Sequence, residues 1–178
     1  MAKVLSPNFK YTNVNYSINV YAIIENAGYV LLTKDNYEGY ESKNPGWKLP
    51  GGGVNANELL LDALKREVKE EVGLEIVPER LLSVSNWHRK DKGITRLRIY
   101  FIAKSKSRKI KPTDDEVAEY RWFTKSELKK LKRKDFFLAP HYYPVVRAYL
   151  DIGGADAIMT ISKTARKERR YDIFLKGK

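Results

Sequence analysis

One stretch of this sequence restricts its fold more than any other: a glycine-rich turn that leads into an amphipathic helix. Pro50 is followed by three glycines, whose lack of a Cβ lets the backbone turn tightly and approach a ligand closely. We expect a helix over Asn57–Val72, because Asn57 is a favourable N-cap residue and Gly73 is a favourable terminator. A glycine-rich turn is therefore expected to lead into this helix.

Three glutamates of the expected helix share one side of it. At about 100° per residue, Glu70 and Glu71 fall on the same arc as Glu67, which is roughly 100° wide. Next to this arc is an apolar stripe that we expect to face the core, formed by Leu61, Leu64, Val68 and Val72. Like charges at these spacings destabilise a helix, and a divalent cation such as Mg²⁺ or Mn²⁺ would relieve the repulsion. A solvated, Glu-rich surface is the alternative interpretation.

Seven residues at fixed spacings favour the metal site over the solvated surface. They are Gly52, Glu58, Arg66, Glu67, Glu70, Glu71 and Gly73. With each residue type at about 6–7% of ordinary usage, chance gives this combination on the order of 10⁻⁸ times per starting position. The arrangement resembles the Nudix box, in which glycine, five residues, glutamate and seven residues precede an Arg-Glu-aliphatic-X-Glu-Glu-X-Gly-aliphatic run. The flanking residues 47–52 and 116–123 also resemble that family.

The resemblance implies an α/β fold, namely a Nudix-type α/β/α sandwich with a mixed β-sheet. The Nudix hydrolase domain would cover residues 17–150, between an irregular N-terminal segment (1–16) and a basic C-terminal tail (151–178). The implied reaction is Mg²⁺-dependent hydrolysis of a pyrophosphate bond in a nucleoside diphosphate-linked substrate, with Mn²⁺ as a possible substitute ion.

The resemblance also implies roles for individual residues. The metal ligands would be Gly52, Glu67, Glu70, Glu71 and Glu116. Glu70 or Glu116 would be the general base, and Arg66 would orient the glutamates. Structural roles in the motif would fall to Glu58, Gly51, Gly53 and Gly73. An exposed loop acid is the alternative interpretation of Glu116.

The rest of the chain predicts strands and helices in mixed order, which favours a mixed sheet with helices packed on it. Strands are expected over 20–24 and 29–33, as a hairpin, and over 47–49, 80–87, 95–103 and 117–123. Helices are expected over 125–133 and 143–150. Gly153-Gly154 marks a boundary, and the weak periodicity beyond it predicts no element.

Substrate contacts are expected from basic and aromatic side chains. In the strand at 95–103, apolar residues alternate with Arg96 and Arg98, which predicts that both arginines lie on a solvated face. There they could meet phosphates, and surface salt bridges are the alternative. Tyr37 and Trp47 are candidates for stacking on a base, with ordinary sheet packing as the alternative. Further aromatic candidates are Tyr40, Trp87, Tyr120 and Trp122.

The net charge of +12 is unevenly placed along the chain. Residues 103–134 hold twelve Lys and Arg against five Asp and Glu, and residues 152–178 hold seven against three. Such segments favour anionic partners, although a solvated surface that serves solubility is the alternative. The leading expected substrate is a (deoxy)nucleoside triphosphate. RNA is the runner-up, through 5′-pyrophosphohydrolysis aided by residues 103–134 and 155–178, and a non-catalytic ligand sensor or nucleic-acid-binding module is a third alternative.

Composition excludes several other kinds of protein. The sequence contains no cysteine, which excludes disulfides, thiolate catalysis and cysteine-ligated zinc. The N-terminus lacks the apolar core of a secretory signal, and no stretch approaches the length of a membrane span. We therefore expect a cytoplasmic protein without a membrane partner, and a homodimer is compatible with the sequence.

Overall fold

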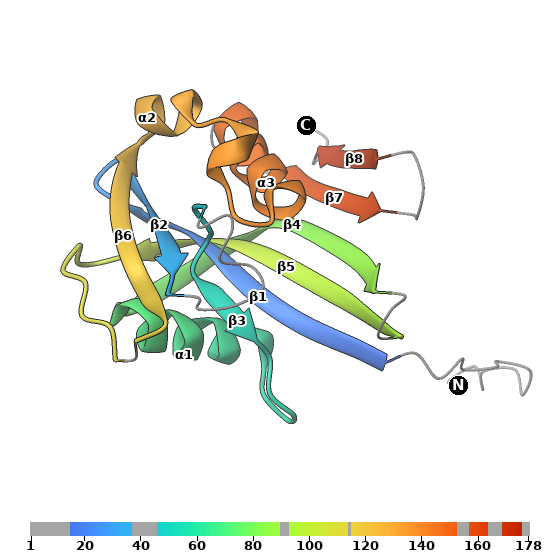
Figure 1. The fold of residues 1–178 in the computed structure, drawn as a ribbon, viewed down its shortest axis with the longest axis horizontal. Helices are drawn as coiled ribbons and strands as arrows, with labels where there is room; N and C mark the ends of the chain where they lie inside the picture. The colour runs from blue at the N-terminus through green and yellow to red at the C-terminus, as the bar shows by residue number, and fades with distance from the viewer. Residues whose placement is uncertain are drawn as a thin grey trace, which may run out of the picture.

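The computed structural model describes residues 15–36, 46–89, 93–113, 115–152, 157–163 and 169–175 (Figure 1). Its strands are β1 (Asn15–Asn26), β2 (Tyr29–Asp35), β3 (Gly51–Gly53), β4 (Ile76–Arg89), β5 (Ile94–Ser105), β6 (Val117–Thr124), β7 (Ala157–Lys163) and β8 (Arg169–Leu175). Its helices are α1 (Leu60–Val72), α2 (Lys125–Lys130) and α3 (Ala139–Ile152), with a 3₁₀ turn, η1 (Arg133–Asp135). Tyr37 and Tyr40, two of the aromatic candidates, lie outside the described residues.

A mixed sheet forms the centre of the fold. Its strand order is β6-β2-β1-β5-β4-β7-β8, and β3 pairs with β1 beside this path. The expected hairpin of β1 and β2 is present, and its turn is made by Ala27 and Gly28, both with positive φ. β1 also runs parallel to β5 along almost its full length. β1 is therefore held on both edges, and the short β3 turn is fixed against a central strand.

Helices cover both faces of this sheet, which confirms the α/β/α sandwich (Figure 1). Alternate residues of β1 explain how. Val20, Ala22 and Ile24 pack into one cluster with the apolar side of α1. Tyr21 and Ile23 point the other way, into a cluster that includes residues of α2 and α3. A strand buried on both sides must be apolar at almost every position, as β1 is over 20–24.

The start of α1 differs from the expectation. The helix begins at Leu60, and Asn57 is not its N-cap because it adopts a left-handed conformation with φ of 63°. Leu61 is 42% exposed, so its place in the predicted core stripe was wrong, and Ala63 is buried instead. The expected terminator is confirmed: Gly73 has φ of 67°, and its N–H donates to the Lys69 carbonyl.

The predicted solvated face of β5 was also wrong. Arg98 is only 2% exposed and Tyr100 is fully buried, while Arg96 is half-buried. The alternation along β5 is real, but α3 covers the face that carries these residues. Apolar alternation indicates which residues share a face of a strand, and it cannot show that the second face is open to water.

The C-terminal region adds two strands to the sheet, where the sequence predicted no element. β7 runs parallel to β4, with Ser83 opposite Met159, and β8 pairs antiparallel with β7. α3 begins at Ala139, four residues before the predicted start at residue 143, and α2 ends at Lys130 rather than at Arg133. Across the described part of the chain, none of the helices has the length and apolar character needed to cross a membrane.

Candidate active site

The glycine-rich turn is pressed against β1. The Ala22 N–H donates to the Pro50 carbonyl at 3.0 Å. Gly51 has φ of 129°, and a Cβ there would lie 2.2 Å from the Val20 carbonyl oxygen. Only glycine fits this position, because both the backbone conformation and the space exclude a side chain. The turn is therefore held between β1 and the second half of α1, where Gly51 contacts Glu71 and Gly53 contacts Arg66.

Gly52 lies directly against the first glutamate of the cluster. A Cβ on Gly52 would be 2.2 Å from Oε2 of Glu67 and 2.6 Å from its Cδ. The carboxylate thus occupies the space that a side chain at Gly52 would fill. The backbone at Gly52 and the Glu67 carboxylate are therefore in direct contact.

Arg66 is the centre of the outer half of the site. Its Nε donates to Glu58 Oε1 at 2.7 Å, and its Nη2 donates to Glu58 Oε2 and to the Gly53 carbonyl, each at 2.9 Å. Its Nη1 reaches Glu67 Oε1 at 2.8 Å and Glu70 Oε2 at 2.9 Å. The guanidinium and the Asn55 N–H hold the pKa of Glu58 down, at about 2. The contact with Glu58 therefore fixes the Arg66 guanidinium among the glutamates.

Glu71 belongs to a separate, buried half of the site. It is 3% exposed, and its Oε2 accepts the Gly51 N–H at 2.8 Å. Its Oε1 lies 2.8 Å from Lys48 Nζ, which also lies 2.5 Å from Asp35 Oδ1. Burial raises the pKa of Glu71 to about 7, although Lys48 and the Gly51 N–H lower it. Burial works against the charged form of Lys48, but Glu71 and Asp35 outweigh it and raise the pKa of Lys48.

The position of each glutamate around α1 explains this division. Glu71 stands next to the apolar stripe, so it is carried into the interior, whereas the Glu70 side chain is 48% exposed on the far edge of the arc. In the outer half, one cation, Arg66, faces three carboxylates, from Glu58, Glu67 and Glu70. Three carboxylates and one guanidinium give this group a net charge of −2, which one divalent cation would balance.

The donors of the outer half suit a hard divalent cation. Glu67 and Glu70 have carboxylate oxygens, which hard divalent cations prefer. Because Gly52 has no side chain, its backbone lies in contact with the Glu67 carboxylate. Within the described residues, no three His, Cys, Asp or Glu side chains converge into a ready-made ion-binding group. The cause is visible in the contacts: Arg66 holds Glu67 and Glu70, and Lys48 holds Glu71. Glu71 would have to give up Lys48 before it could bind an ion.

The segment that carries Glu116 lies close to this site. The Thr113 N–H and hydroxyl both donate to the Glu70 carbonyl, at 3.0 Å and 2.9 Å. The Glu116 carbonyl accepts the N–H of Asn36 at 2.8 Å, next to the Asp35 that pairs with Lys48. Glu116 itself is exposed. The structure therefore brings its segment beside both halves of the glutamate site.

Two of the residues predicted to contact substrate, Trp47 and Arg98, are buried. Trp47 is 8% exposed and packs edge-on against Phe123 at 4.9 Å between ring centroids, so stacking on a base does not fit its position. Arg98 is buried, with Nη1 3.4 Å from His141 Nδ1 and its guanidinium 5.7 Å from the Trp87 ring. The hairpin and helices around these residues bury them because both sheet faces are covered.

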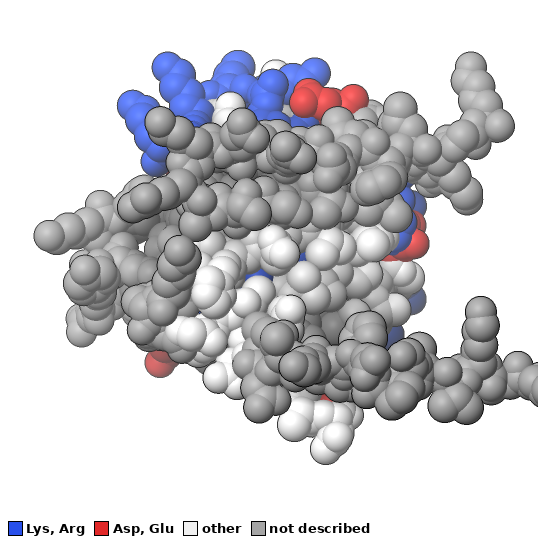
Figure 2. All heavy atoms as spheres, turned by 90° about the vertical axis from the view of Figure 1, so that its right-hand side faces the viewer, with Lys and Arg blue, Asp and Glu red and all other residues white. Residues whose placement is uncertain are grey.

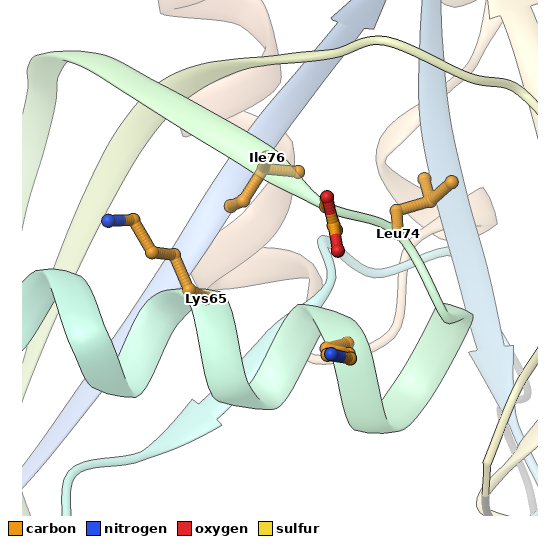
Figure 3. Close-up of a pocket in the computed structure, with 5 residues that line it drawn as sticks. Lys65, Leu74 and Ile76 are labelled. Carbon is orange, nitrogen blue, oxygen red and sulfur yellow. The ribbon is translucent and has the colours of Figure 1, made fainter.

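A hollow of about 250 Å³ on the far side of α1 lies outside this site (Figure 3). Lys65 lines it from the helix, with Leu74 and Ile76 opposite. Lys65 and Lys69 stand two positions on either side of Glu67, which is about 200° around a helix. They therefore face away from the glutamates.

Sequence reasoning missed Lys48, Asp35 and Thr113. Lys48 had a usable signal, since it is the one charged residue of the short apolar strand predicted over 47–49. A lone charge in such a strand needs a partner when the strand is buried. Thr113 and Asp35 had no such signal, because their contacts depend on how distant segments meet.

Known proteins resemble this chain in sequence and in fold. A sequence model of the NUDIX domain matches residues 15–146. The 8-oxo-dGDP phosphatase NUDT18 of Homo sapiens is 35% identical over 85 residues, 46% of this chain and 25% of that protein. The nucleoside triphosphatase NudI of Salmonella agona is 32% identical over 120 residues, 60% of this chain and 80% of that protein. A NUDIX hydrolase structure from Nitrosomonas europaea has a TM-score of 0.62 and 25% identity, covering 76% of this chain and 88% of that one.

The matches differ in how much of each relative they cover. This chain spans only 25% of the length of NUDT18, so most of that protein has no counterpart in the matched region. The family match, in contrast, runs from β1 into α3 and includes the complete glutamate site.

Proposed function

Because this chain belongs to the NUDIX domain family, we propose that it is a Mg²⁺-dependent pyrophosphohydrolase whose first substrate class is (deoxy)nucleoside triphosphates. The observation that carries the proposal is the outer half of the site. There Arg66 holds Glu58, Glu67 and Glu70 beside Gly52, and the group has a net charge of −2. The name of one relative, a nucleoside triphosphatase, supports the choice of substrate.

The proposed reaction breaks one phosphoanhydride bond. A water oxygen forms a bond to phosphorus, the bridging P–O bond breaks, and the leaving phosphate or nucleotide takes the electron pair. The water proton passes to a carboxylate, for which Glu70 is the first candidate because it is 48% exposed, and Glu116 is the second. A bound Mg²⁺ held by Glu67, Glu70 and the Gly52 carbonyl would offset the negative charge that develops on the phosphate oxygens.

The remaining residues of the site act as positioning residues. Glu58 and the Gly53 carbonyl hold the Arg66 guanidinium, which in turn fixes the carboxylates of Glu67 and Glu70. On the buried side, Glu71 accepts the Gly51 N–H and so fixes the glycine-rich turn from within. These contacts limit the movement of the Glu67 and Glu70 side chains and of the glycine-rich turn before substrate binds.

The decisive experiment is a nucleotide panel. Purified protein is incubated with ribo- and deoxynucleoside triphosphates, nucleoside diphosphate-linked compounds and 5′-triphosphate RNA, with Mg²⁺ or with EDTA. We expect release of phosphate or pyrophosphate that EDTA abolishes and Mg²⁺ restores. No release from any member of the panel would overturn the proposed enzyme and favour the non-catalytic alternative.

Substitution of the exposed glutamate tests the site itself. We expect Glu70→Gln to lower kcat by about 10²-fold or more while the melting temperature stays close to that of the wild type. The matched control is Glu119→Gln, since Glu119 is also about half exposed but pairs with Lys34 on β2. Wild-type turnover in the Glu70→Gln variant would show that the site is wrongly assigned.

A further inference from the structure

Lys48 is a buried lysine whose backbone is fixed against β2. Its N–H donates to the Thr33 carbonyl at 2.8 Å, and its carbonyl accepts the Thr33 N–H at 3.1 Å. The residue is only 7% exposed, so its ammonium group lies inside the protein. A lysine side chain has a flexible four-carbon stem that ends in a single charge. A change of partner by this ammonium therefore needs a movement of the side chain and no movement of the backbone.

The charge of Lys48 is separate from the exposed positive charge of the molecule. Figure 2 shows basic side chains gathered at the upper end of the molecule, which is the level of α2 in Figure 1, whereas α1 lies along the lower side of Figure 1. Within the described residues, Lys48 is the cation that forms salt bridges with Glu71 and Asp35. One ammonium and two carboxylates give this buried half of the site a net charge of −1.

Both oxygens of the Glu71 carboxylate have a partner inside the protein. Oε1 accepts a hydrogen bond from Lys48 Nζ, and Oε2 accepts one from the Gly51 N–H, each at 2.8 Å. A divalent cation that binds Oε1 would share this oxygen with the ammonium, and the two cations would repel each other at short range. This repulsion is strong in a buried site, because salt and water screen it little there. Lys48 therefore competes with a divalent cation for Glu71.

Asp35 provides the ammonium with a second partner. Lys48 Nζ lies 2.5 Å from Asp35 Oδ1, and the two atoms form an ion pair. They lack hydrogen-bond geometry, and Asp35 Oδ1 is a buried oxygen that accepts no hydrogen bond from any described residue. A buried acceptor without a donor is costly, and a donor that turns toward it removes this cost. An ammonium that leaves Glu71 can therefore donate to Asp35 and stay inside the protein.

Asp35 is placed by an irregularity in the pairing of β2 with β6. The register shifts between Lys34 and Asp35, so one of the two strands has an extra residue there. Such bulges bend a strand and redirect nearby side chains, and they are frequent next to active sites. Lys34 forms a salt bridge with Glu119 on β6, whereas Asp35 reaches Lys48. Two adjacent residues of β2 thus contact different partners, and Lys34 is a matched control for Lys48.

We propose that Lys48 occupies the place of a cation at Glu71 in the resting protein, and that Asp35 receives its ammonium when a divalent cation binds Glu71. The proposal rests on the Mg²⁺-dependent function proposed above and assigns Lys48 and Asp35 as positioning residues for it. Glu67 and Glu70 are the first ligands of the ion, because they lie in the outer half of the site. Glu71 becomes available only after the ammonium has moved. The exchange changes hydrogen-bond partners, and no covalent bond forms or breaks.

Mn²⁺ binding in the absence of nucleotide tests this exchange separately from hydrolysis. Isothermal titration calorimetry at about pH 8, where protons compete little for the carboxylates, gives the affinity of wild type, Lys48→Met and Asp35→Asn. Lys34→Met is the matched control, because it removes the same charge one position from Asp35 and its salt bridge is with Glu119. Circular dichroism verifies that all four proteins are folded.

We expect Lys48→Met to bind Mn²⁺ at least about tenfold more tightly than wild type, because the competing cation is removed. Asp35→Asn should bind about tenfold more weakly, because the ammonium then keeps Glu71. Lys34→Met should bind with the affinity of wild type. Mn²⁺ should also raise the melting temperature of Lys48→Met more than that of wild type. A lysine that only stabilised the fold would not tighten metal binding when it is removed.

The double variant Lys48→Met/Asp35→Asn separates the exchange from the charge of Asp35 itself. If Asp35 acts through Lys48, Asp35→Asn weakens Mn²⁺ binding much less in the Lys48→Met background than in wild type. An equal effect in both backgrounds would overturn the role of Asp35. If Lys48→Met alone does not fold, the double variant, which has one carboxylate fewer, is compared with Asp35→Asn. Tighter binding in the double variant is then the expected result, and equal binding would overturn the role of Lys48.

The contrary results distinguish this proposal from the proposed function. If Lys48→Met binds Mn²⁺ like wild type, or if Lys34→Met gains as much affinity, the role of Lys48 is overturned, and hydrolysis of the nucleotide panel by wild type still supports the function. If Lys48→Met binds Mn²⁺ more tightly but wild type hydrolyses no nucleotide, the exchange stands and the function is overturned. If none of the proteins binds Mn²⁺, both are overturned.

Discussion

Lys48 Nζ lies 2.8 Å from Glu71 Oε1, and Lys48 is only 7% exposed, so one glutamate of the motif is paired with a cation from inside the protein. Asp35 completes the group at 2.5 Å from the same nitrogen. The family resemblance implied that Glu71 is a metal ligand equivalent to Glu67 and Glu70. In this structure its two carboxylate oxygens contact the Gly51 N–H and the Lys48 Nζ.

The first prediction follows from this ion pair. Lys48→Met leaves the buried Glu71 and the partly buried Asp35 without their cation, and breaking a buried pair in this way costs about 3–5 kcal/mol. We expect a loss of that size in the free energy of unfolding, measured by urea denaturation. The surface substitution Lys104→Met, which breaks the exposed pair with Glu79, should change stability far less.

A double variant identifies the cause of that loss. Adding Glu71→Gln to Lys48→Met removes one unpaired charge, so part of the stability should return. If the two substitutions are simply additive, the interaction of Lys48 with Glu71 contributes nothing and the buried pair is not what holds this region.

The second prediction concerns the contact between Gly52 and Glu67. In Gly52→Ala the new Cβ would meet the Glu67 carboxylate at 2.2 Å, and the flexible side chain would have to move. We expect folding to survive and kcat/KM to fall by about 10²-fold, the effect of misplacing a catalytic group by about 1 Å. Gly53→Ala is the matched control, because a Cβ there meets nothing within 4 Å. Equal activity in the two variants would contradict the close contact.

The third prediction compares two glycines with positive φ. Gly73 has φ of +67°, and a Cβ there would lie 1.9 Å from the Lys111 carbonyl oxygen, which belongs to the backbone. Gly28 has φ of +83° with open space around it. Gly28→Ala should therefore cost only the left-handed strain, about 1–2 kcal/mol, and Gly73→Ala clearly more. Thermal unfolding of both variants measures the difference, and equal losses would contradict the steric part of the argument.

The sequence predicted well those features that depend on local periodicity. The β1–β2 hairpin, the end of α1 at Gly73 and the α/β/α sandwich follow from apolar spacing, turn residues and the family resemblance. The three glutamates were correctly placed on one arc of α1. The angular positions of the glutamates did not predict that Glu71, which lies next to the apolar stripe, would be buried.

The features that the sequence missed depend on contacts between distant segments. Arg98 alternates with apolar residues like a solvated side chain, yet α3, which starts 41 positions later at Ala139, covers it. Lys48 meets Asp35 and Glu71 only because β2, the 47–49 strand and α1 converge. The two C-terminal strands have weak periodicity of their own. They join the sheet because β7 pairs with β4 and β8 pairs with β7. Periodicity describes one helix or strand at a time and contains no information on the contacts between distant segments.

The fourth prediction uses the low pKa of Glu58. Its carboxylate accepts hydrogen bonds from Arg66 Nε, Arg66 Nη2 and the Asn55 N–H, which lower its pKa from 4.5 to about 2. A carboxyl whose pKa is lower in the folded state contributes stability above its unfolded pKa, and this contribution is lost as the pH falls through the folded pKa. The wild type should therefore be more stable than Glu58→Gln by a constant margin above about pH 5.5, and the margin should shrink from about pH 4.5 downward. Melting temperatures of both proteins between about pH 7 and pH 3 test this, and a margin that stays constant down to pH 3 would contradict the Arg66–Glu58 pairing as its source.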